Sequence, residues 1–446
     1  MRKYDSYKPT KIEFLDEIPE HWEEKRMRFL GYLYGGLSGK SATDFNQLTN
    51  EANKYFIPFT NIANNFKIDP ESLQTVVISE NENQNSVQKG DIFFLMSSEN
   101  YDDVGKSAVL LDDLEETYLN SFCKGFRITK DDIVPEFLNY QLHSKQLRHN
   151  LLTGANGFTR INLKIDKVID LLTALPTPEE QTAIASYLDR KTAEIDELIA
   201  DKKRLLELYE EEKTAIINQA VTKGINPDIP MKDSGIEWLG EIPKHWEVKP
   251  IKYEIAKRID NRGRTPEFGT EGIPMLEVKQ ISEHSKYPIE QFEKYVQPEI
   301  LKQYLREELC EGDILIATVG ATAGKCCIVP ANPYYFIAQN VIGFRFKKHN
   351  NPNYFYYLIQ SDFFKNSLFS INKSNTIDNL KVSVFIDNII PLPDSTAQEE
   401  IASYIEANIK IFDVKVSKIE KLIELLTEYR TALISEVVTG KIKVIE

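Results

Sequence analysis

Apolar residues near the C-terminal end of the chain recur at alternating spacings of four and three. No Gly or Pro interrupts residues 401–438. Heptad spacing of this kind predicts a long amphipathic helix that buries one stripe against another helix. The stripe is broken only at Arg430 and comprises Ile405, Ile409, Phe412, Val416, Ile419, Ile423, Leu426, Arg430, Leu433 and Val437.

A second helix of the same design is predicted at residues 184–221, which also lack Gly and Pro. Two such helices most simply bury their stripes against each other, and we expect an antiparallel pair that holds two domains at opposite ends. Alternatively, each helix packs on its own domain. Arg430 and Lys202 should extend to water or pair with acids of the other helix. The second stripe is widened by Leu198, Leu205 and Leu208 and comprises Leu188, Thr192, Ile195, Ile199, Lys202, Leu206, Tyr209, Lys213, Ile216 and Ala220.

Outside these helices the hydrophobic pattern changes to short runs that are typical of β-strands. In the first half, the runs at 76–78, 92–95 and 108–111 are separated by Gly and Asn turns. The pattern predicts an α+β fold with two pseudo-symmetric globular domains joined by the antiparallel coiled coil. We place the domains at residues 1–174 and 225–391, and the helical spacer regions at 175–224 and 392–446.

The two halves of the chain carry the same landmarks in the same order. EIPEHWE at residues 17–23 returns as EIPKHWE at 241–247. The separation between landmarks is roughly 217 to 224 residues, far longer than a solenoid period. Gly and Pro landmarks fix turns while the loops between them differ, so one scaffold carries two unlike surfaces. Further pairs are Ile57-Pro58 with Ile273-Pro274, Gly90-Asp91-Ile92 with Gly312-Asp313-Ile314, Gly105-Lys106 with Gly324-Lys325, and Gly125-Phe126-Arg127 with Gly343-Phe344-Arg345.

Composition places the chain among soluble globular proteins that can bury two or more cores. The sequence starts without an apolar signal segment, and no apolar run approaches the ~18 residues that cross a bilayer, so we expect a cytoplasmic protein. The net charge of −14 argues against a protein that coats DNA indiscriminately, because non-specific affinity comes from Lys and Arg. The four cysteines show no zinc-ligand spacing and are expected to be reduced and structural.

The repeated entry and exit motifs resemble those of the specificity subunits of type I restriction-modification systems. EIP-x-HWE precedes each domain, and each domain ends in a Leu-Pro motif that leads into a helix. Residues 394–397 depart from the Pro-rich turn of the first exit, which leaves the local turn shape open. The exit motifs are Leu175-Pro176-Thr177-Pro178-Glu179-Glu180-Gln181 before Ile184-Ala185, and Leu392-Pro393 with Gln398-Glu399-Glu400-Ile401-Ala402.

The resemblance covers essentially the whole chain and implies two target recognition domains, each of which reads one half of an asymmetric, interrupted double-stranded DNA sequence. It also implies that the helices set the gap and dock two methyltransferase subunits, through which restriction subunits join. The family's specificity subunit carries no catalytic centre or metal, and S-adenosylmethionine, ATP and magnesium are expected in the partner subunits. In agreement, the sequence contains no Asp-Pro-Pro-Tyr or Asn-Pro-Pro-Phe motif that would hold a flipped adenine.

Candidate DNA contacts are polar loop residues at positions that both halves share. Arg, Lys, Asn and Gln read base edges, while Ser and Thr often position phosphates. An ordinary solvated loop residue is the alternative for each of them. The repeated positions favour Lys106 with Lys325, and Arg160 with the 373–376 loop. The full set is Lys40, Ser41, Ser97, Ser98, Asn100, Lys106, Asn156, Thr159, Arg160, Arg262, Arg264, Thr265, Lys279, Gln280, Thr318, Thr322, Lys325, Lys373, Asn375 and Thr376.

Two enzyme-like patterns supply rival interpretations. Residues 35–41 resemble a phosphate-binding P-loop, but they are one residue short of the motif, so nucleotide binding is not predicted. Glu267, Glu277 and Lys279 imitate a nuclease site in which two acids hold a metal and a lysine supports the attacking water. A self-sufficient, metal-dependent DNA nuclease is therefore the alternative function. We interpret His21 and His245, beside the repeated tryptophans, as packing or turn residues.

Overall fold

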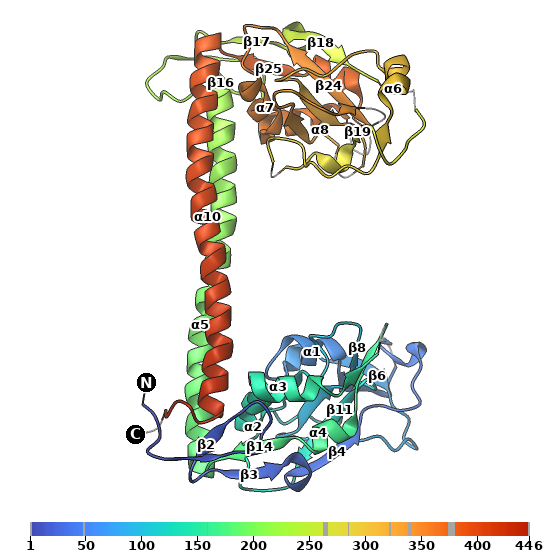
Figure 1. The fold of residues 1–446 in the computed structure, drawn as a ribbon, viewed down its shortest axis with the longest axis vertical. Helices are drawn as coiled ribbons and strands as arrows, with labels where there is room; N and C mark the ends of the chain where they lie inside the picture. Colours follow the sequence, from blue (N-terminus) through green and yellow to red (C-terminus); the bar gives the residue numbers. More distant parts are fainter. Residues whose placement is uncertain are drawn as a thin grey trace. The chain divides into compact units, whose positions relative to one another are not determined.

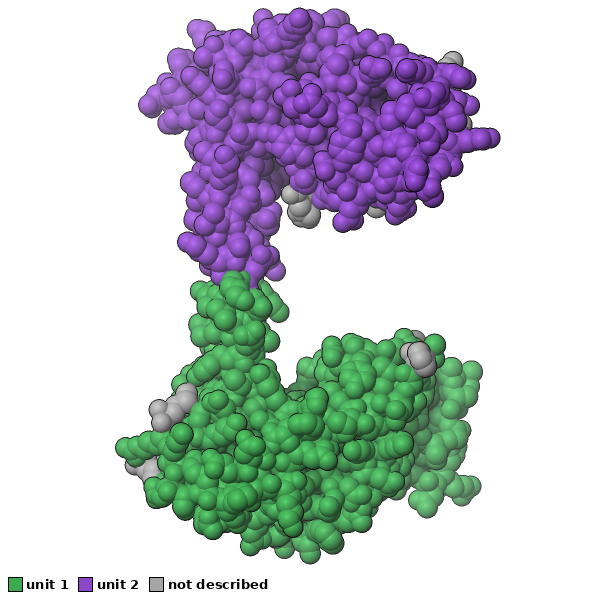
Figure 2. Space-filling model, in the orientation of Figure 1, with its two compact units in different colours: residues 1–203, 421–446 green, residues 204–420 purple. Residues whose placement is uncertain are grey.

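The computed structural model describes residues 2–47, 50–157, 159–261, 266–283, 285–320, 323–337, 340–372 (backbone only for 369–372) and 380–444. The chain divides into two compact units, which are coloured separately in Figure 2. Unit 1 comprises residues 1–203 and 421–446, and unit 2 comprises residues 204–420. Each unit therefore combines a globular domain with part of each long helix. Within the described residues, no helix is long and apolar enough to cross a membrane.

Unit 1 is built around an antiparallel four-stranded sheet in the order β4-β11-β7-β9. Its β7 strand is wholly buried, which explains the uninterrupted apolar run at residues 92–95. Two three-stranded sheets, β10-β5-β6 and β12-β13-β8, and the pairs β14-β3 and β1-β2 complete the domain. The strands are β1 Tyr7–Pro9, β2 Glu17–Pro19, β3 Glu23–Arg26, β4 Gly31–Gly35, β5 Asn53–Ile57, β6 Gln74–Val77, β7 Ile92–Leu95, β8 Ser97–Ser98, β9 Ser107–Val109, β10 Thr117–Leu119, β11 Cys123–Ile128, β12 Ala155–Asn156, β13 Ile161–Leu163 and β14 Leu172–Leu175; the short helices are α1 Phe59–Asn64, α2 Pro135–Leu142, α3 Lys145–Leu152 and α4 Ile165–Ile169.

Unit 2 repeats the central sheet in the order β18-β24-β21-β22, again antiparallel. Its other sheets are β20-β19-β23 and the pairs β17-β25 and β15-β16. In both units one strand pair outside the central sheet is parallel: β10 with β5, and β19 with β23. The strands are β15 Met231–Asp233, β16 Glu241–Pro243, β17 Glu247–Pro250, β18 Ile255–Ile259, β19 Ile273–Leu276, β20 Tyr295–Val296, β21 Ile314–Ala317, β22 Cys326–Ile328, β23 Phe336–Ile337, β24 Val341–Phe346 and β25 Ile389–Leu392; the short helices are α6 Pro298–Tyr304, α7 Pro352–Gln360, α8 Asp362–Asn372 and α9 Val382–Asp387.

The repeated sequence landmarks form repeated structural contacts. Gly90 and Gly312 both adopt a positive φ, which favours glycine, and each precedes a buried aspartate. That aspartate is paired in both units with the arginine of the Gly-Phe-Arg landmark on the neighbouring strand. The landmarks therefore hold the central sheet together, which explains why they recur while the intervening loops differ.

The two long helices are α5 (Pro178–Lys223) and α10 (Ser395–Val438), and they pack together as an antiparallel pair (Figure 1). In unit 1, Arg430 Nη2 donates to Asp196 Oδ2 at 3.1 Å. In unit 2, Lys213 Nζ lies 3.9 Å from Asp413 Oδ1 at the equivalent place in the repeat. The predicted α+β fold, the paired helices and the pairing of Arg430 with an acid of the other helix are confirmed.

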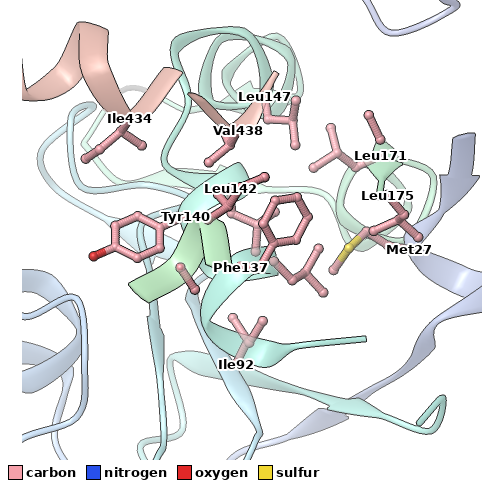
Figure 3. Close-up of a cluster of buried hydrophobic side chains, with 14 of the residues drawn as sticks. Met27, Ile92, Phe137, Tyr140, Leu142, Leu147, Leu171, Leu175, Ile434 and Val438 are labelled. Atoms are coloured by element: carbon pink, nitrogen blue, oxygen red, sulfur yellow. The ribbon is translucent and has the colours of Figure 1, made fainter. Parts of the chain in front are cut away.

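Both helices also contribute side chains to the cores of the globular domains. Each helix therefore packs both on the other helix and on a domain, as the two alternatives predicted separately. In unit 1, Leu188 of α5 and Val437 of α10 belong to the same buried cluster as Phe137 of α2. Figure 3 shows Ile434 and Val438 of α10 beside the side chains of α2. The domain is thereby fixed to its part of the helix pair by a continuous apolar core.

The entry motif of unit 1 lies against the start of α5. Glu180, almost fully buried, accepts hydrogen bonds from Tyr4 Oη at 2.6 Å and Trp22 Nε1 at 3.3 Å, and His21 Nε2 lies 2.8 Å from it. Such burial of a carboxylate is tolerated because polar partners surround it. His21 thus belongs to a structural hydrogen-bond cluster. In unit 2, Ala397 occupies the place of Glu180. Asp394 Oδ1 accepts from the Ala397 amide at 2.9 Å at the start of α10, as Thr177 Oγ1 accepts from the Glu180 amide at 3.4 Å at the start of α5.

Candidate nucleic-acid interface

Several of the predicted contacts in unit 1 meet in the small sheet β12-β13-β8. Ser97 and Ser98 form β8, whose neighbour β13 pairs with it at Asn162 and Ile161. Asn156 lies on β12, and Thr159 and Arg160 lie on the turn that joins β12 to β13. Both serines are nearly buried, whereas Asn156, Thr159 and Arg160 are exposed. The exposed edge of this sheet therefore lies at the β12–β13 turn.

Arg160 stacks on an aromatic side chain that the sequence prediction did not include. Its guanidinium carbon lies 4.4 Å from the centroid of the Phe122 ring, which is 47% exposed. Lys124, two residues further on at the start of β11, is half-buried and forms no ion pair with any described residue. Phe122 was missed because base-reading side chains were sought among polar residues. An exposed Phe beside an Asn turn is the signal that could have found it.

Two other predicted cations of unit 1 are neutralised by neighbours. Lys40 Nζ donates to the Val77 carbonyl at 2.6 Å and pairs with Glu82, and only 6% of its side chain is exposed. The Lys40 ammonium lowers the pKa of the Glu82 carboxyl to about 2. Lys106 Nζ lies 2.6 Å from Asp103 Oδ1. DNA contact by Lys40 or Lys106 would have to replace these partners.

The remaining candidates of unit 1 have local structural roles. Ser41 caps the short 3-10 helix Ala42–Asp44 in a capping box with Asp44. Asn100 accepts from the Asp102 amide at 3.1 Å and donates its own amide to Ser98 Oγ at 3.1 Å. Such local bonds order the loops without using all of the polar atoms.

In unit 2 the described candidates are also paired or buried. Lys279 lies between Glu277 and Glu293, and Lys325 Nζ lies 3.7 Å from Glu283. Gln280 is buried and Thr318 donates to the Asn340 carbonyl at 2.9 Å. Seven predicted contacts lie outside the described residues: Arg262, Arg264, Thr265, Thr322, Lys373, Asn375 and Thr376.

The nuclease-like constellation of unit 2 has a structural explanation. Glu277 accepts from Lys294 Nζ at 2.6 Å and forms a capping box at the start of the 3-10 helix Val278–Gln280. Its carboxylate is thus shared between Lys294, Lys279 and the backbone. Among the residues that the structure describes, no group of three or more metal-ligating side chains is found. The geometry gives the nuclease interpretation no support.

A family model described as "Type I restriction modification DNA specificity domain" matches residues 19–208 and 243–425. The chain is 26% identical to the putative type I restriction enzyme MjaX specificity subunit of Methanocaldococcus jannaschii, over 99% of this chain and 98% of that protein. It is 28% identical to the MjaIX specificity subunit of the same organism, over 72% of this chain and 73% of that protein.

Two solved structures have a similar fold at 15% sequence identity. One comes from a study entitled "Structural basis underlying complex assembly and conformational transition of the type I R-M system", with a TM-score of 0.72 over 95% of this chain and 99% of that chain. The other is the HsdS subunit of Thermoanaerobacter tengcongensis, with a TM-score of 0.56 over 95% of this chain and 98% of that chain.

Proposed function

Because the chain belongs to the family of type I restriction-modification specificity subunits, which are non-catalytic, we propose that it recognises a bipartite, asymmetric double-stranded DNA site, one half per unit. One observation carries this proposal: the two units share a frame but differ in their loops. The central sheets have the same strand order and the same buried Asp–Arg pair. The exposed residues beside them are unlike, since the position of Phe122 is taken by Asn340 in unit 2. Two unlike surfaces on one frame suit two unlike half-sites.

The DNA contacts in this proposal are sequence-selective and few. A chain with a net charge of −14 has no general attraction for phosphates, so its affinity must come from local groups. In unit 1 the exposed Arg160, Thr159 and Asn156 are predicted contacts that remain accessible without breaking an ion pair, as are Ser41 and Asn100. Because the DNA target lies inside the cell, the proposal places the chain in the cytoplasm.

The helix pair is the proposed docking site for two methyltransferase subunits, through which restriction subunits would join the complex. Besides the heptad stripe that packs against α5, α10 carries a second apolar stripe that remains exposed. At 3.6 residues per turn these side chains share one side of the helix. Exposed apolar stripes of this kind mark protein interaction sites. The stripe consists of Tyr404, Ile411, Val414, Leu422, Leu425 and Tyr429, which are 40–55% exposed.

Methylome sequencing tests the proposal directly. A host that expresses the chain together with its methyltransferase subunit should carry modified adenines in a motif with two specified halves and an unspecified gap. The control host expresses the methyltransferase subunit alone and should lack this motif. A single undivided motif, or no motif when the methyltransferase is active, would contradict bipartite recognition.

A further inference from the structure

We propose that Arg160, held by stacking on Phe122, reads a guanine in the major groove of the half-site that unit 1 recognises. This inference rests on the proposed function and assigns a specificity-determining pair to one half of the site. Arginine pairs with the O6 and N7 atoms of guanine through two parallel hydrogen bonds. The assignment depends on where Arg160 lies, what holds it, and what surrounds it.

Arg160 is displayed at the end of a tight turn. Gly157 closes the turn with a φ of 143°, and a Cβ at this position would lie 1.9 Å from the Arg160 carbonyl oxygen. Only glycine fits there without moving the backbone. The strands on either side are fixed by pairing of β13 with both β12 and β8. The backbone of Arg160 is therefore positioned while its side chain is exposed.

The guanidinium of Arg160 is free for a ligand. It forms no ion pair with any described residue, in contrast to Lys40 and Lys106, whose ammonium groups are held by carboxylates. Its contact is the face of Phe122. The guanidinium donates no hydrogen bond to any described residue, so its five N–H donors are not used by the protein around it. Stacking thus restricts the side chain without using its hydrogen-bond donors.

Phe122 is itself rigidly supported. Its amide donates to Asn120 Oδ1 at 3.0 Å, and the Asn120 amide donates to the Ile57 carbonyl at 3.1 Å. The turn is also packed against Gly36, where a Cβ would lie 2.1 Å from the Asn120 carbonyl oxygen. The backbone of Phe122 is therefore held in place, and contact of Arg160 with the Phe122 ring before binding lowers the entropy that the arginine side chain loses when DNA is bound.

The surface beside Phe122 is suited to a close approach of DNA. Lys124 follows Phe122 by two residues and pairs in register with Gly35 of β4. The Lys124 side chain lies over Gly35, with Nζ 3.5 Å from the point where a Cβ on Gly35 would be, so the two residues share one face of the sheet. Gly35 and Gly36 add no side chains to that face. A cation beside a flat glycine surface can contact a phosphate while Arg160 reaches a base edge.

The described position of unit 2 that corresponds to Phe122 holds no aromatic residue. The glycines at the centres of β11 and β24, Gly125 and Gly343, both pair with the adjacent central strand, which makes Asn340 the counterpart of Phe122. Asparagine has no aromatic face on which a guanidinium could stack. We therefore expect the Arg160–Phe122 pair to affect one half-site alone.

The test uses the complex of the full chain with its methyltransferase subunits and a double-stranded DNA library randomised across the site. Selection and sequencing should give a bipartite motif for the wild type. Arg160→Ala should reduce the preference for guanine at one position of one half-site by roughly 5- to 150-fold. Phe122→Leu should weaken the preference at the same position by less, and Arg160→Lys should retain overall affinity while losing part of the preference.

Lys130→Ala is the matched control, since it removes an exposed positive charge beyond the other end of β11 and should leave the motif unchanged. An unchanged half-site in Arg160→Ala would overturn the inference. So would an equal loss of affinity for all sequences with a shallower salt dependence, which would identify a phosphate contact. If the wild type itself selected no bipartite motif, the proposed function would fail, and this outcome is distinct from failure of the Arg160 assignment.

Discussion

Arg127 binds both carboxylate oxygens of Asp91, with Nε 3.0 Å from Oδ1 and Nη2 2.7 Å from Oδ2. The carboxylate is buried, with 2% of the Asp91 side chain exposed. The pair joins β11 to the residue that precedes β7, so it fastens the centre of the sheet. Asp91 holds the pKa of Arg127 above its ordinary value.

Arg127→Ala should destabilise unit 1 by about 3–5 kcal/mol, because it leaves a buried carboxylate without its charged partner. Hydrogen exchange followed by mass spectrometry measures this, since peptides from β7 and β11 report the opening of unit 1 separately from unit 2. The control is Lys54→Ala, which removes an exposed ion pair with Glu116 and should leave protection nearly unchanged. Equal protection in wild type and Arg127→Ala would contradict a stabilising role.

His143 should make unit 1 less stable in mild acid. Burial lowers the pKa of His143 to about 4, and the positive charges of Arg148, Arg430 and Lys106 act in the same direction, against a hydrogen bond with the Ser107 carbonyl. In the unfolded chain the pKa is about 6.5. Between these values the unfolded state binds more protons, so stability should fall as the pH drops from about 6.5 to about 4, by at most about 3 kcal/mol. Thermal melting across this range measures the fall.

Unit 2 supplies the matched variants for this experiment. Gln360 occupies the place of His143 and donates from Nε2 to the Cys326 carbonyl at 3.3 Å, as His143 Nε2 does to Ser107 at 2.8 Å. His143→Gln should therefore keep the hydrogen bond and reduce the acid sensitivity of unit 1. Gln360→His should introduce acid sensitivity into unit 2. The same pH dependence in wild type and His143→Gln would refute the assignment.

The long helices and the repeated frame of the two domains could be predicted because their sequence patterns are local and occur twice. Heptad spacing identified both long helices, and the landmark glycines and the Gly-Phe-Arg motif matched between halves before their contacts were known. Arg430 was recognisable as a seam residue that needs an acid, and Asp196 supplies it. The Asp394 cap shows how the second exit turn keeps its role without the second proline.

The candidate DNA contacts were harder to predict, because whether a polar side chain is free depends on partners that are distant in the sequence. The sequence favoured Lys106 and Arg160 through their repeated positions and also offered Lys40, but it could not show which of these cations is paired. Lys40 is paired with Glu82, which is distant in the sequence, whereas the Arg160 guanidinium lies over Phe122 and forms no ion pair with any described residue; neither arrangement has a local signature. Gln280 and Thr318 are polar but buried, which only the packing of unit 2 reveals. Charge that is available for DNA is a property of the tertiary structure.

The exposed stripe of α10 should be needed for assembly with the methyltransferase subunits. Leu422→Glu and Leu425→Glu each place a charge where an apolar contact is proposed, at residues that are 40% and 48% exposed. Because neither side chain is in the core, the chain should fold normally. Its affinity for the methyltransferase subunit should fall about tenfold or more, since desolvating an unpaired charge costs more than the ~1.4 kcal/mol that tenfold requires.

Isothermal titration calorimetry with the purified methyltransferase subunit measures this affinity. Ser417→Glu is the control, because it adds the same charge at an exposed polar position of α10 outside the stripe. Ser417→Glu should bind as the wild type does. Normal binding by both leucine variants would show that the docking surface lies elsewhere.

The length of the helix pair should set the gap between the two half-sites. Seven residues inserted after Glu207 in α5 and after Lys418 in α10 preserve the heptad register of both helices. They lengthen the pair by about 10 Å, which corresponds to roughly three base pairs of B-DNA. Methylome sequencing should then give the wild-type half-sites separated by a gap about three base pairs longer.

Insertion into α5 alone is the informative control for this change. It changes the register of α5 against α10, so the Asp196–Arg430 contact of unit 1 and the Lys213–Asp413 contact of unit 2 cannot both be kept while both helices stay continuous. That variant should lose stability and complex yield, whereas the double insertion should not. If the double insertion supported methylation with an unaltered gap, the spacing of the half-sites would have to be set by the globular domains or the partner subunits instead of by α5 and α10.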